Sequence, residues 1–234
     1  MSQTNRETRL TDWDFGNVTE DTNDYRIPFY HGALYESCRL TPRDLFFTGY
    51  TYGKNKIKIS QALCPLTKTR LNINNKIYAY GKVIDTPKFS KYRRGFFSFT
   101  FRMFEPFFYT AERTFTLQEN ESGTAYNMGD VETPLNITLF SKELTVVSDP
   151  YIKNLSTNQS ISLKYVLPTG AKIIIDTSVD KKTIQIVKSD GALNGLGYLN
   201  FESELFLLRT GENVITSNCR AEIRFKNKFL EFLL

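Results

Sequence analysis

The alternation of apolar and polar residues between Leu135 and Leu139 constrains the fold more than any other feature of the sequence. Leu135, Ile137 and Leu139 fall on one side of an extended chain, and the intervening polar residues fall on the other. This period of two predicts a strand with one buried face. Turn-forming residues precede it, and Pro134 stands at its head, where a missing N–H costs least. We therefore place the entry into a second β domain here.

Short strands separated by Gly, Pro and Asn recur along the whole chain. The sequence contains 19 Phe and 13 Tyr, and flat rings pack well on pleated sheets. A mainly β fold with antiparallel sandwiches is therefore predicted. One strand on each side of Pro42, or one broken strand, is expected between residues 38 and 52. The glycines at 191–197 predict a flexible loop. The other predicted strands cover residues 69–73, 76–84, 95–104, 135–139, 160–167, 171–176, 183–187, 214–216 and 221–225.

One short helix is predicted between Ile57 and Leu66. Its apolar residues follow the spacing of a single helical face, and Pro65 should end or kink it; the residues of that face are Ile59, Ala62, Leu63 and Leu66. Residues 1–23 are polar and predict either a docking strand or a partly ordered arm. Residues 25–34 predict a loop with buried aromatic contacts.

Composition excludes several classes of protein. No apolar run is long enough to cross a bilayer, and the N-terminus lacks the apolar segment of a signal peptide, so we expect synthesis in a cytoplasm and no membrane association. The three cysteines, Cys38, Cys64 and Cys219, share no metal-like spacing. We interpret them as free thiols that mostly fill the core.

The positive charge of the chain is concentrated in its first half. Between Arg43 and Arg102 there are 13 lysines and arginines against only two acidic residues, Asp44 and Asp85. Such a block can meet nucleic acid, an acidic partner or only water. Tyrosines interleave with the lysines as in stacking platforms for nucleic acid. The same interleaving arises wherever a strand alternates a buried ring with a solvated cation, so these alternatives stay open.

No catalytic constellation is apparent. The single histidine, His31, lies in an aromatic loop and favours a structural role, and neither a nucleophile elbow nor a phosphate-binding glycine loop is present. Glu202 and Glu204 are the nearest carboxylate pair, and the wet face of a strand explains them more simply. We predict no enzymatic activity and no cofactor or metal. A carbohydrate-binding role is an alternative, and its candidate stacking residues are Tyr151, Tyr165 and Tyr198.

Two sets of motifs resemble the distal tail protein (Dit) family of siphophages that infect Gram-positive bacteria. In the first half, Ile27–Leu34, Pro42–Gly49, the predicted helix, Tyr78–Val83 and Pro106–Tyr109 follow the order of the family. In the second half, Asn127–Asp130 followed by Pro134 is similar to the entry into the galectin-like domain of the family. The run Phe206–Ile215 is similar to an L-x-x-G-x-N-x-I turn in that domain.

The resemblance implies a ring-forming domain at residues 1–120 and a galectin-like antiparallel sandwich at residues 121–234. Six copies would form a hub between the tail tube protein and the tail-tip or tail-associated lysin protein, with receptor-binding proteins nearby and a channel through which DNA passes. The protein would reside at the virion tail tip and assemble in the host cytoplasm. The basic residues would then lie at contacts between subunits or rings; the candidates are Lys54, Lys56, Lys58, Lys91, Arg93 and Arg94.

Overall fold

Strand pairing divides the chain into two units in the computed structural model, which describes residues 9–25, 34–51, 55–64, 68–73, 76–90, 95–141 and 146–231. The first unit is Met1–Phe108 with Leu230–Leu234, and the second is Tyr109–Phe229. The sequence places the boundary after residue 120. Contacts place it at Tyr109, because strand β10 (Arg113–Leu117) pairs with β21 (Arg220–Phe225) of the second unit.

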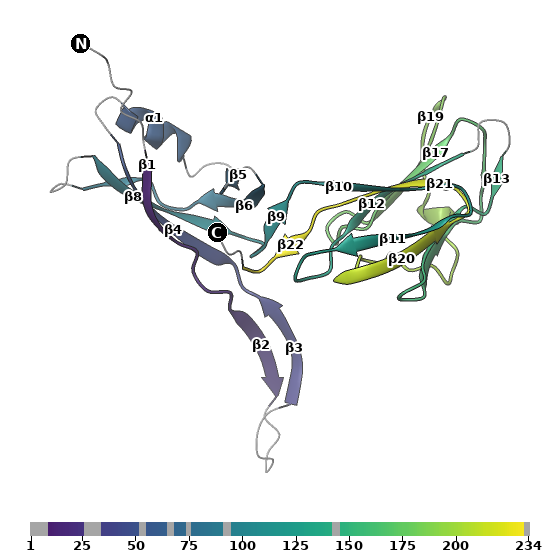
Figure 1. Ribbon diagram of the computed structural model, residues 1–234, viewed down its shortest axis with the longest axis horizontal. Coiled ribbons are helices and arrows are strands. Elements are labelled where there is room, and N and C mark those ends of the chain that lie inside the picture. Colours follow the sequence, from purple (N-terminus) through teal and green to yellow (C-terminus); the bar gives the residue numbers. More distant parts are fainter. Residues whose placement is uncertain are drawn as a thin grey trace. The chain divides into compact units, whose positions relative to one another are not determined.

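The first unit is built on one antiparallel sheet (Figure 1). Its neighbouring strands are, in order, β1 (Arg9–Asp14), β4 (Arg43–Tyr50), β8 (Phe96–Met103) and β6 (Ile77–Val83). In addition, β5 (Thr69–Asn72) pairs with β6, and β7 (Lys88–Phe89) pairs with β8. Strand β9 (Phe108–Thr110) begins at the last residue of the first stretch of this unit. The strands β2 (Glu20–Tyr25) and β3 (Leu34–Leu40) pair with each other in a separate sheet.

Alternation along β4 and β8 produces the core of the first unit. Leu45, Phe47, Phe99 and Phe101 are buried, whereas Phe46 on the opposite face is half exposed. The rings of Phe47 and Phe99 stack with their centroids 5.0 Å apart. Each such buried side chain contributes about 1.5–3 kcal/mol through removal of apolar surface from water. The strand predicted at 95–104 is therefore present as β8, and its alternating aromatic residues are buried on one face.

The helix is shorter and more exposed than the sequence predicts. Helix α1 spans Asn55–Ala62, and none of its residues is buried. The predicted apolar face does not reach a core, and Ile57, outside that face, is 68% exposed. Pro65 and Leu66 lie outside the described residues. No helix in the described ranges has the length and apolar character needed to span a bilayer. The prediction of core-filling cysteines is correct for Cys219 and wrong for Cys64, which follows α1 and is exposed.

The second unit is a β-sandwich. One sheet has the order β10, β21, β12 (Leu135–Phe140), β17 (Lys172–Asp176), β18 (Thr183–Lys188) and β19 (Gly191–Asn194). The other has the order β11 (Ser122–Asn127), β20 (Gly211–Ser217), β14 (Tyr151–Asn154) and β15 (Gln159–Ser162). Smaller elements are β13 (Val147–Ser148), β16 (Val166–Leu167), the 3₁₀ turn η1 (Leu196–Tyr198) and β22 (Lys228–Phe229).

Both sheets contribute to a single core. Ile137 and Ile173 from the first sheet and Ile152, Ile161 and Ile215 from the second belong to one cluster, each with no exposed surface. The alternation predicted for 135–139 is confirmed in β12, whose apolar residues are buried while Asn136 is exposed. The mainly β class with one short helix is confirmed, and the galectin-like detail stays a prediction.

Two segments of the second unit differ from the sequence prediction. The single strand predicted at 160–167 is two strands, β15 and β16, because the chain turns between them and β16 pairs with β13. The glycine-rich stretch is not wholly a loop, because Gly191–Asn194 forms β19 and pairs with β18. Gly191 has φ +145°, a conformation that only glycine adopts easily, so the turn into this strand requires it.

Buried asparagines explain the two motifs of the second half. The side-chain amide of Asn127 donates to the carbonyls of Val131 and Leu208, and its oxygen accepts from the N–H of Gly129. The amide of Asn213 donates to the carbonyls of Arg209 and Gly211. A buried amide without partners would cost about 1–3 kcal/mol, so these turns are fixed by their hydrogen bonds.

Candidate interaction surface of the first unit

The register of the first sheet places charged residues in rows across its outer face. One row runs Asp12, Thr48, Ser98 and Lys88, from β1 through β4 and β8 to β7. Because residues paired in antiparallel register point to the same face, this row begins with an acid on the edge strand β1 and ends with a base on β7, a short strand beside β8. Asp14 and Phe46 lie in the next row.

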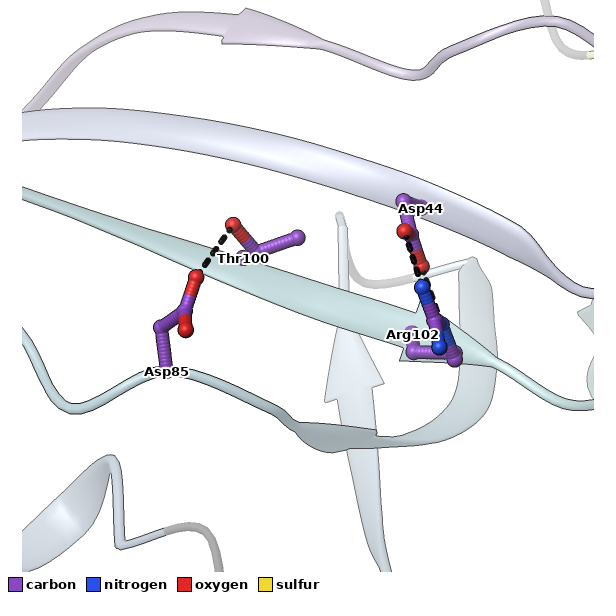
Figure 2. Close-up of polar contacts among 4 residues, drawn as sticks. All are labelled: Asp44, Asp85, Thr100 and Arg102. Carbon is purple, nitrogen blue, oxygen red and sulfur yellow. Dashed lines mark hydrogen bonds and ion pairs between the residues drawn. The ribbon is translucent and has the colours of Figure 1, made fainter.

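Two polar contacts fasten this face (Figure 2). The guanidinium of Arg102 donates to both carboxylate oxygens of Asp44, at 2.7 and 2.6 Å. This bidentate hydrogen bonding raises the pKa of Arg102 above its ordinary value. The hydroxyl of Thr100 donates to Asp85 at 3.3 Å. Asp44 and Asp85, the two acidic residues of the basic block, thus both accept hydrogen bonds from side chains of β8. In the sequence, the only sign of this was that these two carboxylates are heavily outnumbered by lysines and arginines.

A buried arginine joins three segments of the first unit. Arg43 is 5% exposed, and its guanidinium donates to the carbonyls of Phe15, Gly16 and Leu230. It also lies 5.1 Å from the ring centroid of Phe108. Burial lowers the pKa of Arg43 despite the carboxylates of Glu231 and Asp14, which favour the charged form. Arg43, on β4, therefore holds two segments in place: Phe15 and Gly16, which follow β1, and Leu230, near the end of the described chain.

The basic residues singled out from the sequence divide into two groups. Lys54, Lys91, Arg93 and Arg94 lie outside the described residues. Lys56 and Lys58 lie on α1, and the ammonium of Lys56 is 5.4 Å from the ring centroid of Phe89 on β7. Helix α1 and β7 together form an open groove of about 630 Å³, lined by Lys56, Ile57, Ser60, Gln61, Cys64 and Phe89. The lining is mainly apolar with one cation.

The tyrosines considered for glycan contact are only partly brought together. The rings of Tyr165 and Tyr198 meet edge to face with centroids 4.9 Å apart. The ammonium of Lys188 lies 5.7 Å from the Tyr165 centroid, and its contact with Tyr165 raises the pKa of Lys188. Beside Tyr165 lies a shallow pocket of about 530 Å³. Within the described chain, no ring contact joins Tyr151 to this pair.

A comparison with known families decides the relationship of the second unit. Residues 128–229 match the model of a family described as siphovirus-type tail component, C-terminal domain. The second unit is therefore similar to this family over most of its length. Since the matched residues contain the buried Asn213 turn and nearly all strands of the sandwich, the match covers the domain rather than a single motif.

Solved structures extend the similarity to the whole chain. The crystal structure of the Dit protein of phage SPP1 matches with a TM-score of 0.75 and 14% identity, over 95% of this chain and 94% of that one. That protein is described as a paradigm of the hub adsorption apparatus in phages infecting Gram-positive bacteria. Because only 14% of the residues are identical, this match shows a similar fold and no more. The resemblance to distal tail proteins is therefore confirmed, by sequence in the second unit and by fold over the chain.

Two further matches come from the phage P2 baseplate in its activated conformation. The structure with Ca gives a TM-score of 0.55 and 16% identity, and that with Sr gives 0.54 and 15%. Each covers 97% of this chain and 93% of the other. No curated protein matches the sequence.

Proposed function

We propose that this protein is a structural hub of a phage tail tip. Six copies would form a ring that joins the tail tube protein to the tail-tip protein and to adsorption proteins, with DNA passing through the centre. The carrying observation is the match to the SPP1 Dit fold over both units, together with the tail-component family of the second unit. In this role the protein acts as a scaffold, not as an enzyme.

The construction of the first unit supports self-assembly. Strands β2 and β3 form a two-stranded sheet, and in the described ranges neither pairs with any further strand. Such a sheet is marginally stable by itself in water. Strand β1 ends the main sheet, and all six of its residues are exposed. Both features leave strand edges for a neighbouring subunit to cover.

The carbohydrate-binding alternative has weaker support. A sugar ring stacks on the open face of an aromatic side chain, but Lys188 approaches Tyr165 over its ring and Tyr198 packs edge to face with it. The pocket beside Tyr165 does bring Asp149, Lys164 and Asn200 together. We retain this alternative for the second unit only.

Native mass spectrometry of the full chain tests the proposal. We expect a species with the mass of six 27.1-kDa chains that persists on dilution into the micromolar range. Class averages of the same sample in negative stain should show sixfold rings. A strictly monomeric or dimeric chain at every concentration, with binding to a sugar array, would favour the carbohydrate-binding alternative.

A further inference from the structure

The two edges of the first sheet differ in a way that suits head-to-tail contact. Strand β1 forms one edge, and β7, together with α1 above it, forms the other side next to β8. Leu10 and Trp13 of β1 are 47% and 46% exposed. In a head-to-tail ring, each subunit carries two different surfaces, and one surface fits the other on the next subunit.

On each face of the sheet, the residue on β1 is of a kind that can pair with the residue on β7 of another copy. On one face, a row runs Leu10, Gly49, Phe97 and Phe89, so an exposed leucine stands at one edge and the groove-lining phenylalanine at the other. Gly49 leaves room for the ring of Phe97, since a Cβ there would lie 2.6 Å from it. On the opposite face, the row described above begins at Asp12 and ends at Lys88.

The charges near each edge agree with this pairing. Strand β1 contributes Asp12 and Asp14, both exposed. Helix α1 contributes Lys56 and Lys58 and contains no acidic residue, and β7 contributes Lys88. The groove between α1 and β7 has an apolar floor suited to an apolar side chain from outside. If the sheet of one copy continues into the sheet of the next, the same faces of the two sheets lie side by side. The apolar residues then meet on one face and the opposite charges meet on the other.

We propose that β1 of one copy docks along β7 and α1 of the next copy, with Leu10 and Trp13 at the apolar groove and, on the opposite face of the sheet, Asp12 and Asp14 near Lys88. This inference rests on the proposed ring and specifies its subunit contact. The contact is directional, so each subunit gives one edge and receives the other, and repetition of the contact closes a ring of six when neighbouring copies are related by a rotation of one sixth of a turn.

Disulfide trapping tests the contact, because Cys64 lies in the groove and is exposed. In a Cys38→Ser background of the full chain, Leu10→Cys should bond to Cys64 of the neighbouring copy under mild oxidation. Non-reducing gels should then show a ladder of covalent species up to six copies. The ladder should vanish in Leu10→Cys, Cys64→Ser.

Asp12→Cys is the matched control, because it lies on the same strand but on the opposite face of the sheet. It should give at least tenfold less cross-linked product, and circular dichroism should show that each variant is folded. Rings in native mass spectra without a ladder would overturn this contact and leave the hub intact. A monomeric parent chain would overturn the hub, and a ladder ending at two copies would overturn the head-to-tail arrangement.

Discussion

Replacing Ile137 by alanine should lower the free energy of unfolding of the second unit by about 3–4 kcal/mol. Ile137 has no exposed surface and lies at the centre of β12, between β17 and β21. Removing its branched side chain loses transfer free energy and leaves a cavity that neighbouring β-branched residues fill poorly. Chemical denaturation at fixed protein concentration, followed by far-ultraviolet circular dichroism, measures the change.

Asn136→Ala provides the matched control for this substitution. Asn136 neighbours Ile137 on the same strand but is exposed, so its replacement should change the unfolding free energy by less than about 0.5 kcal/mol. Trp13, the only tryptophan, lies in the first unit and reports on that unit by fluorescence. The fluorescence transition should stay in place for both variants. Equal losses for Ile137→Ala and Asn136→Ala would contradict the sandwich core described here.

Replacing Arg43 by methionine should lower the free energy of unfolding of the first unit by about 3 kcal/mol. The change preserves most of the side-chain volume but removes the donors for three backbone carbonyls. Hydrogen bonds from a charged donor contribute about 1.5–3 kcal/mol each, and the relief of burying a charge offsets part of the loss. The midpoint of the Trp13 fluorescence transition in denaturant measures the effect.

Arg39→Met is the control for Arg43→Met. The Arg39 side chain is 84% exposed and forms one surface ion pair with Asp21 at 3.6 Å. Surface pairs of this kind contribute at most about 1 kcal/mol, so the control should unfold close to the parent chain. If Arg43→Met were as stable as Arg39→Met, the three carbonyls would have other partners and the anchoring role of Arg43 would be wrong.

Local periodicity was sufficient to predict the strands with one buried face. Ile137 in β12 and Phe99 in β8 lie on the faces that alternation indicates, because one-sided burial imposes a period of two. The helix prediction overestimated its buried face. The spacing of Ile59 and Leu63 is helical, but no core lies beneath α1, and periodicity cannot reveal what a helix packs against.

The sequence pattern did not predict which strands pair when they lie far apart along the chain. Gly191–Asn194 was expected to be a loop because glycine disfavours strands, but pairing with β18 overrides that preference. The bond between Asp44 and Arg102 joins residues 58 positions apart and depends on the β4–β8 register. Of the tyrosines proposed for glycan contact, Tyr165 and Tyr198 lie in contact in the fold. Arg43 was missed because an isolated arginine carries no signal of burial.

Imaging of the virion tests the central claim most directly. A small epitope on the fully exposed Phe201 loop of the second unit would mark this chain in intact particles with a gold-labelled antibody fragment. We predict label only at the distal end of the tail, and averaged tail-tip density that contains one ring of six copies. Label distributed along the tail or on the capsid, or a tail-tip ring without this chain, would contradict the account.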